Sequence, residues 1–279
     1  MSRSRRRGPS IAESLREYGR GIGGGFLFSL PLLLTMEVWD AGVTVSPVRL
    51  LAGLAATFVL LCGYNAYAGL RHDTRLDEIL VDSVEELGIG LALSAGILWM
   101  LGRINGASSL PEVTGLILVE GFFVAVGVSV GTAQLTGATD EGGQPSGRQQ
   151  TIASELALAF CGAVLIAANV APTEEILVLA SEMGPLLLLA VLLSSLVLAA
   201  TLLYFSNFRG SARFAGNRGL FGVVHGTAIT CAAGLVASAA VLWFFGRFDG
   251  HSLTLNVAQC VVLGMAGTLG AAAGRLLLR

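Results

Sequence analysis

The chain has 279 residues, of which 54% are hydrophobic and only 13% are charged, and its mean hydropathy is +0.75. A soluble domain carries about 25% charged residues, so this composition argues against a soluble enzyme and predicts that lipid is the main solvent of the protein. The formal net charge is −2, from 17 basic residues that are all arginine and 19 acidic residues, which argues against a nucleic-acid-binding surface.

Eight apolar segments are long enough to cross a bilayer, which takes about 20 residues because a helix rises about 1.5 Å per residue. In chain order, the predicted spans are Gly21–Val43, Val48–Leu70, Asp82–Leu101, Val113–Gln134, Thr151–Ala171, Gly184–Phe205, Leu220–Phe245 and Leu253–Leu278. We therefore predict an all-α fold, a polytopic membrane bundle of eight transmembrane helices.

Two polar segments lie outside these spans. Residues 1–20 form a basic tail, in which 11–20 either lies on the inner leaflet as a short amphipathic helix or extends the first span. Residues 135–150 are rich in Gly, Asp and Gln and predict a linker. With the N-terminus inside, 14 of the 17 arginines fall on the inner side, so we expect the linker and both termini in the cytoplasm of a prokaryote with the chain in its inner (plasma) membrane.

The two halves of the chain are similar to each other in sequence. Residues 98–106 match residues 242–250 at five of nine positions, including the tryptophan, the arginine and both glycines, with an offset of 144. Three glycines of the fourth span recur 143 residues later, and a Thr-x-Glu motif recurs 138 residues later. Residues 21–134 and 151–279 are therefore predicted to be parallel four-helix repeats about a pseudo-twofold axis along the membrane normal. Chance similarity between apolar segments is the alternative.

Glycines four residues apart occur in both halves, at Gly127 and Gly131 and again at Gly270 and Gly274. Small residues at this spacing let two helices approach closely in lipid, so we predict packing faces there and assign these glycines no chemistry. The arginine of each repeated segment is expected at the outer interface, where it either snorkels to water or pairs with an outer carboxylate.

Acidic residues at or inside the spans are the candidate functional residues, because a charge in a membrane span costs about 2.5–3.5 kcal/mol on insertion scales. Glu120 is the strongest candidate, since it lies about two turns inside an otherwise apolar span. The carboxylate and hydroxyl oxygens of such residues are suitable ligands for Ca²⁺ or Mg²⁺, and the carboxylates can also relay protons. The predicted ion pathway consists of Glu37, Glu120, Glu175, Thr35, Thr173 and Glu174, with Asp82, Glu85 and Glu86 at its inner mouth.

A simpler interpretation exists for most of these residues. Glu37, Glu174 and Glu175 stand near span ends, where they can face water, and the inner acids stand in the first turn of their predicted helix, where they favourably meet the helix dipole. Leu263 occupies the position that matches Glu120, so any pathway is asymmetric. A pathway requires the acids to converge on a polar cavity between the halves.

Other chemistry is scarce in the sequence. It has no H-E-x-x-H motif, no nucleotide-binding glycine loop and no evident nucleophile–base pair. We therefore predict no enzyme activity and no cofactor.

The runs 28–39 (FSLPLLLTMEVW) and 169–175 (NVAPTEE) resemble a prokaryotic family of integral membrane proteins known as a domain of unknown function. The resemblance implies a multispanning membrane protein and brings no substrate. The second run is also similar to Asn-x-Pro-Glu-type motifs of cation/calcium exchangers, but those stand in inverted halves, whereas these halves are predicted to be parallel.

The predicted function is passage of an inorganic cation (Ca²⁺, Mg²⁺, a monovalent cation or H⁺) through a channel or transporter that uses intramembrane carboxylates. The alternative is a non-transporting membrane sensor or scaffold. The expected partners are the lipid bilayer, the cation and a second copy of the chain, and not nucleic acid.

Overall fold

A computed structural model describes residues 11–68, 75–136, 152–210 and 219–277, which are all helical apart from turns and short connections. The ten helices of these segments are α1 (Ile11–Leu33), α2 (Met36–Thr44), α3 (Pro47–Ala68), α4 (Leu76–Met100), α5 (Leu110–Thr136), α6 (Ile152–Ala168), α7 (Glu174–Glu182), α8 (Pro185–Gly210), α9 (Gly219–Phe244) and α10 (Leu253–Leu277). The predicted all-α class is therefore confirmed. Residues 1–10 of the basic tail and nearly all of the predicted linker lie outside the described residues.

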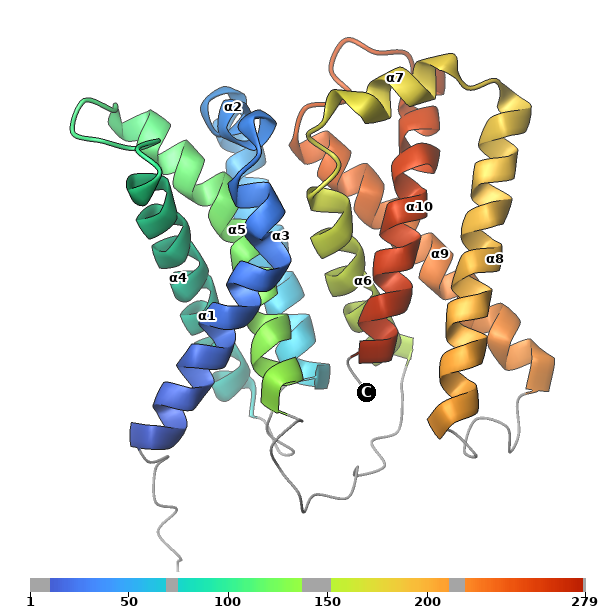
Figure 1. Cartoon of the computed structure of the whole chain (residues 1–279), viewed down its shortest axis with the longest axis horizontal. Helices are drawn as coiled ribbons and strands as arrows, with labels where there is room; N and C mark the ends of the chain where they lie inside the picture. The colour runs from blue at the N-terminus through green and yellow to red at the C-terminus, as the bar shows by residue number, and fades with distance from the viewer. Residues whose placement is uncertain (1–10, 69–74, 137–151, 211–218, 278–279) are drawn as a thin grey trace, which may run out of the picture.

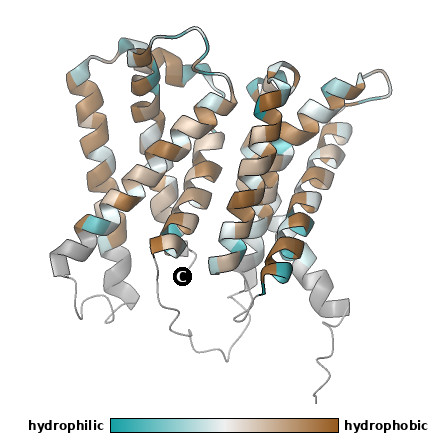
Figure 2. Cartoon of the chain, turned by 180° about the vertical axis from the view of Figure 1, so that it is seen from behind, coloured by the Kyte–Doolittle hydropathy of each residue, from teal (hydrophilic) through white to brown (hydrophobic). Residues whose placement is uncertain are grey.

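Six helices, α3, α4, α5, α8, α9 and α10, are long and apolar enough to cross a membrane. The pair α1 and α2 makes a seventh candidate if it is counted as one broken span, because the two helices meet at an angle of 85°. Helix α6 is apolar but shorter than these. By length and composition, the described residues thus contain six to seven candidate spans, where the sequence predicts eight. Figure 2 shows apolar residues along the long helices and more polar residues at their ends.

The first and fifth predicted spans differ from the structure for the same reason. The segment 21–43 turns sharply after Leu33, so its outer part is the separate short helix α2. The segment 151–171 ends as a helix at Ala168, and the chain continues through Pro172 into the short helix α7. Figure 1 shows α7 lying across the upper ends of the long helices. A continuous apolar run therefore concealed a change of chain direction in both places.

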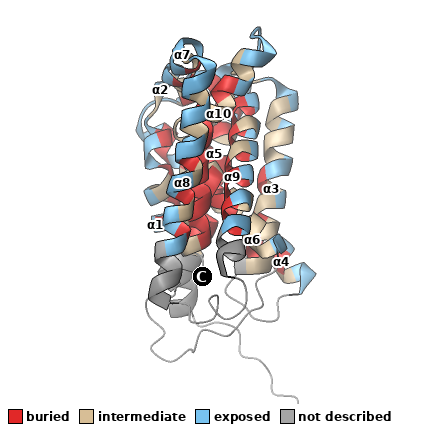
Figure 3. Cartoon of the chain, turned by 90° about the vertical axis from the view of Figure 1, so that its right-hand side faces the viewer, coloured by how far each residue is buried: buried red, intermediate tan, exposed pale blue. Residues whose placement is uncertain are grey.

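The helices form two groups that lie side by side, α1–α5 and α6–α10 (Figure 1). Helix α5 packs against each of α1–α4, and α10 packs against each of α6–α9. In α5, 78% of the apolar window is buried, against 17% in α3 and in α8, so α5 is central and the other two helices face outward. Figure 3 shows buried residues concentrated around α5, α9 and α10.

Glycines bring the central helices into close contact with α1 and α6. A Cβ atom on Gly24 would lie 2.2 Å from the Cα of Gly131, and one on Gly162 would lie 2.2 Å from the carbonyl oxygen of Gly270. Such distances leave no room for a side chain, which confirms the predicted packing role of these glycine faces.

The two groups meet through apolar side chains. The rings of Phe122 and Phe123 on α5 contact Phe244 at centroid distances of 6.1 and 5.9 Å, and Phe123 stacks on Phe245 at 5.7 Å. Aromatic residues bury large apolar areas, so these four residues form a hydrophobic contact between the two groups of helices.

Candidate functional site

Glu120 lies on α5 and is completely buried, with 0% of its surface exposed. Neither carboxyl oxygen has a hydrogen-bond partner among the described residues. Its neighbours on α5, Val119 and Phe122, belong to a hydrophobic cluster that also contains Leu32 and Val38. Burial of an unpaired carboxyl in such surroundings is destabilising. A contribution to stability therefore does not explain why an acid stands at position 120.

Two side chains from other elements act electrostatically on the Glu120 carboxyl, Trp39 of α2 and Arg103 of the α4–α5 connection. The indole N–H of Trp39 donates to the carbonyl of Leu33 at 3.2 Å. The guanidinium carbon of Arg103 lies 4.2 Å from the centroid of the Trp39 ring, a cation–π contact. Trp39 and Arg103 thus form a polar cap on Glu120 at the end of the group where α2 lies, and no sequence pattern connects these three residues.

The other predicted outer acids stand in the first turns of the two short helices. Glu37 is half-buried at the start of α2, whereas Glu174 and Glu175 are exposed at the start of α7. Acids in this position favourably meet the helix dipole. A hydrogen bond from its own backbone N–H holds the pKa of the Glu175 carboxyl below its usual range. Among the contacts of the described residues, none joins these acids to Glu120.

Glu174 also has a specific partner. Its Oε1 atom lies 2.7 Å from Nη1 of Arg247, the arginine of the second repeated segment. The sequence left two roles open for that arginine, snorkelling to water or pairing with an outer carboxylate, and in the structure it pairs with a carboxylate. Arg103, its counterpart in the first repeated segment, stacks on Trp39 instead.

The predicted helper threonines take part in the chain reversals. The hydroxyl of Thr35 donates to the carbonyl of Pro31, and that of Thr173 donates to the carbonyl of Val170 at 2.9 Å. Both residues are the N-caps of the short helices, in extended backbone conformation. Each hydroxyl thereby satisfies a carbonyl of the turn that precedes its helix.

The inner acids lie deeper than the sequence predicts. Helix α4 begins at Leu76 and not at Asp82, so Asp82, Glu85 and Glu86 stand in its second and third turns, beyond the reach of a first-turn dipole effect. The expectation that they begin their helix is therefore wrong. Glu85 is exposed and Asp82 is half-buried.

Glu86 is held by a partner on another helix. Nδ2 of Asn65 on α3 donates to Oε2 of Glu86 at 2.8 Å and to Oγ of Ser83 at 3.1 Å. Nearby, the hydroxyls of Tyr64 on α3 and Ser129 on α5 are buried without a hydrogen-bond partner in the part of the chain that the structure describes. Glu86 thus lies in a small polar cluster between α3, α4 and α5, which we call the inner cluster (Tyr64, Asn65, Ser83, Glu86 and Ser129).

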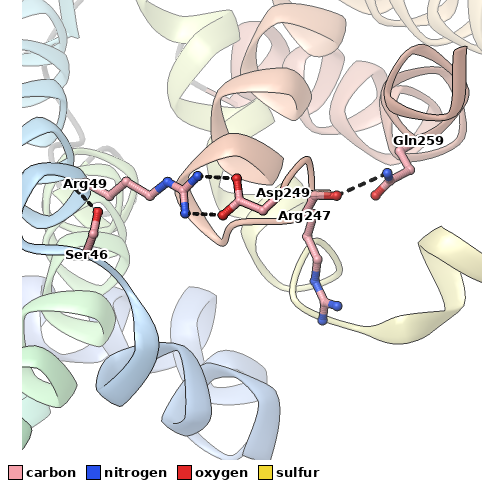
Figure 4. Close-up of polar contacts among 5 residues, drawn as sticks. All are labelled: Ser46, Arg49, Arg247, Asp249 and Gln259. Atoms are coloured by element: carbon pink, nitrogen blue, oxygen red, sulfur yellow. Dashed lines mark hydrogen bonds and ion pairs between the residues drawn. The ribbon is translucent and has the colours of Figure 1, made fainter. Parts of the chain in front are cut away.

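An ion pair connects the two groups of helices at the end of the molecule where α7 lies (Figure 4). Nη1 and Nη2 of Arg49, at the start of α3, contact the two carboxylate oxygens of Asp249 at 2.7 and 2.6 Å. The Arg49 guanidinium lowers the pKa of the Asp249 carboxyl through this bidentate contact. The same guanidinium lies 5.6 Å from the ring centroid of Trp243. The sequence did not predict this pair, because no local pattern links two positions 200 residues apart.

A second ion pair lies near the opposite end of the α6–α10 group. Arg275 on α10 is only 6% exposed, and its Nη2 contacts Oε2 of Glu155 on α6 at 2.9 Å. Its Nη1 donates to the carbonyl of Gly226 and to the hydroxyl of Thr230, both at 2.6 Å. Arg275 is one of the 14 arginines that the sequence predicts on the inner side. The structure shows it as a buried residue whose guanidinium is held by protein groups.

Buried hydroxyls also recur on α4 and α9 at the offset of the repeated segment. Ser83 and Ser94 on α4 correspond to Thr227 and Ser238 on α9, 144 residues later, and all four side chains are buried. Gly90 lies between the first pair and contacts Ala125 of α5. The offset of 144 between residues 98–106 and 242–250 also holds for the helix before each of these segments. Applied there, it would have predicted the buried hydroxyls from the sequence.

An all-helical fold with six to seven apolar spans and charged groups buried between helices defines an integral membrane protein. Residues 17–278 match the family model described as "Putative integral membrane protein (DUF2391)". The chain belongs to this family, and the resemblance noted in the sequence is confirmed. No curated protein and no solved structure matches the chain. Within the described segments, no group of three or more His, Cys, Asp and Glu side chains is arranged to hold a metal ion.

Proposed function

We propose that the protein moves a proton or an inorganic cation across the membrane, with Glu120 as the group that binds it on the way. The observation that carries this proposal is the complete burial of a carboxyl without a hydrogen-bond partner among the described residues. A buried unpaired charge is destabilising by several kcal/mol, and ionisable groups inside spans serve ion or proton pathways in many membrane proteins. Leucine at the matching position 263 is equally buried, so the fold itself needs no acid there.

The same proposal includes an architecture of two parallel repeats. In it, α1, α3, α4 and α5 cross the membrane in the first repeat and α6, α8, α9 and α10 in the second, with α2 and α7 on the outer side. The matching packing of α5 and α10 within their groups supports it, as do the glycine contacts at matched positions. Helix α1 begins and α10 ends at the same end of the molecule (Figure 1), in keeping with both termini in the cytoplasm.

The remaining predicted site residues take lesser roles in this proposal. Glu37, Glu174 and Glu175 concentrate cations at the outer surface through their charge, and Thr35 and Thr173 fix the helices that carry them. Asp82 and Glu85 do the same at the inner surface. The exposure of Glu85, Glu174 and Glu175 supports this division of roles.

One observation favours a sensor or scaffold that transports nothing. The pathway predicted from the sequence runs between the halves, and phenylalanines of α5 and α9 pack against each other there. A pathway that agrees with this packing passes through the α1–α5 group, where Glu120 lies, and not along the contact between the groups.

Ion flux in proteoliposomes tests the proposal. The full chain is reconstituted, and H⁺, Na⁺, K⁺, Mg²⁺ and Ca²⁺ movements are followed under imposed gradients for the parent, Glu120→Gln and Leu263→Gln. We expect flux of one ion in the parent, its loss in Glu120→Gln and its retention in Leu263→Gln, which places an equally buried amide in the other group of helices. Equal flux in parent and Glu120→Gln would remove Glu120 from the mechanism, and absence of all flux in the parent would favour the scaffold.

A further inference from the structure

The inner cluster and Glu120 lie on opposite sides of the closest contact between α4 and α5. A Cβ atom on Gly90 of α4 would lie 2.6 Å from the backbone nitrogen of Ala125, and one on Gly121 of α5 would lie 2.5 Å from the side chain of Leu91. The two helices run in opposite directions, so Glu86 stands on the inner side of this contact and Glu120 on its outer side. The tight contact separates the buried carboxyl of Glu120 from the half-buried carboxyl of Glu86 in the same group of helices.

Buried hydroxyls without partners accompany both carboxyls. On the inner side, Tyr64 is 1% exposed and Ser129 is 2% exposed, and neither hydroxyl has a partner in the described segments. On the outer side, Ser94 of α4 is equally buried and equally unpartnered. Buried polar atoms of proteins are nearly always hydrogen-bonded, so this set of unpaired groups is typical of a site that binds something.

The second group of helices contains a filled counterpart of the inner cluster. Thr230 stands 144 residues after Glu86, and Arg275 stands 143 residues after Thr132, the offsets found for these helices in the sequence. The guanidinium of Arg275 contacts Thr230 and the carboxylate of Glu155. A permanent cation therefore occupies this place in the second group, whereas the first group has a carboxylate and no arginine at the matched position.

The groups around Glu86 favour a proton over a metal ion as the species bound. Ca²⁺ takes about six to eight oxygen ligands, and Mg²⁺ needs near-octahedral geometry. One carboxylate oxygen of Glu86 already accepts a hydrogen bond from the Asn65 amide, which occupies part of its capacity as a metal ligand. The titratable side chains that act on Glu86 are Tyr64 from α3, Asp82 and Glu85 from its own helix and Cys161 from α6. None of them is a cation that would neutralise the carboxylate.

We propose that Glu86, with Tyr64 and Ser129, is a second proton-binding site in series with Glu120, and that the proton path runs within the α1–α5 group alone. This inference rests on the proposed function and narrows its ion to H⁺. The tight α4–α5 contact separates an outer site from an inner one, and the Arg275–Glu155 pair closes the equivalent place in the second group.

Carbodiimide labelling tests the site without any transport measurement. N,N′-dicyclohexylcarbodiimide reacts with protonated carboxyls in apolar surroundings, and mass spectrometry of the reconstituted chain locates the adducts. We expect adducts on Glu120 and Glu86 that decrease as the pH rises, and none on Glu155, which is half-buried like Glu86 but paired with Arg275. An unlabelled Glu86, or one labelled no more than Glu155, would overturn the inference.

Proton flux then separates this inference from the proposed function. Glu86→Gln and Tyr64→Phe are compared with Glu155→Gln, each checked for a monodisperse gel-filtration profile. We expect proton flux to be lost in Glu86→Gln, reduced in Tyr64→Phe and retained in Glu155→Gln. Parent-like proton flux in Glu86→Gln, or flux of Na⁺ or K⁺ in place of H⁺, would overturn the inference while the role of Glu120 stands. Labelled Glu86 in a parent chain without any flux would overturn the proposed function instead.

Discussion

Replacing Glu120 with leucine should stabilise the protein while it removes the proposed function. The substitution deletes two buried oxygens that have no hydrogen-bond partner among the described residues and installs the residue found at the matching position 263. Burial of an unpaired polar group costs about 1–3 kcal/mol in protein mutational data. Since leucine has a similar volume and an apolar surface, we expect Glu120→Leu to raise the free energy of unfolding by about 1–3 kcal/mol.

Equilibrium unfolding in mixed micelles, followed by circular dichroism, measures this difference. Leu263→Glu is the matched control, because it places a carboxyl without a designed partner in the other group of helices and should destabilise by a similar amount. A lower free energy of unfolding for Glu120→Leu than for the parent would refute the reasoning. It would mean that the Glu120 carboxyl has a stabilising partner in the folded protein.

Two further substitutions test the packing and the buried ion pair. Gly24→Ala should destabilise the fold by about 1–3 kcal/mol through overpacking, since its Cβ would lie 2.2 Å from the Cα of Gly131. The control Gly96→Ala, whose Cβ would have nothing within 4 Å, should be neutral or stabilising by up to about 1 kcal/mol. Equal effects of the two substitutions in thermal unfolding would contradict the close contact. Arg275→Met should destabilise by up to about 3–5 kcal/mol because it leaves the half-buried carboxylate of Glu155 without its partner. Adding Glu155→Gln should recover much of that loss, and a double variant as unstable as the single one would show that the pair itself is not the cause.

Most of the transmembrane helices could be predicted from composition, but the chain reversals could not. An apolar run of about 20 residues is long enough to cross a bilayer, and this rule located the helices from α3 to α5 and from α8 to α10. The same rule joined α1 to α2, because the bend of 85° after Leu33 lies inside an apolar run that is long enough for one span. Proline at position 31 and threonine at position 35 were visible signals of this bend, and their backbone consequence depends on the hydrogen bond between them.

In the candidate site, only a residue that can be identified from its own position in the sequence was predictable. Glu120 stood out because it is an acid deep inside an apolar span, and its burial agrees with that expectation. The sequence placed Glu86 at the start of a predicted helix. In the structure it lies inside α4, where the amide of Asn65 on another helix donates a hydrogen bond to it, and no local pattern predicts that contact. The burial of Arg275 could not be predicted, because its partner Glu155 is 120 residues away in sequence. Pairings of this kind depend on the tertiary fold and leave no local pattern.

Proton uptake by proteoliposomes under an imposed pH gradient tests the central claim most directly. The parent chain should take up protons, and Glu120→Gln, which preserves the size of the side chain but cannot exchange a proton, should not. Equal proton uptake in parent and Glu120→Gln would contradict the account.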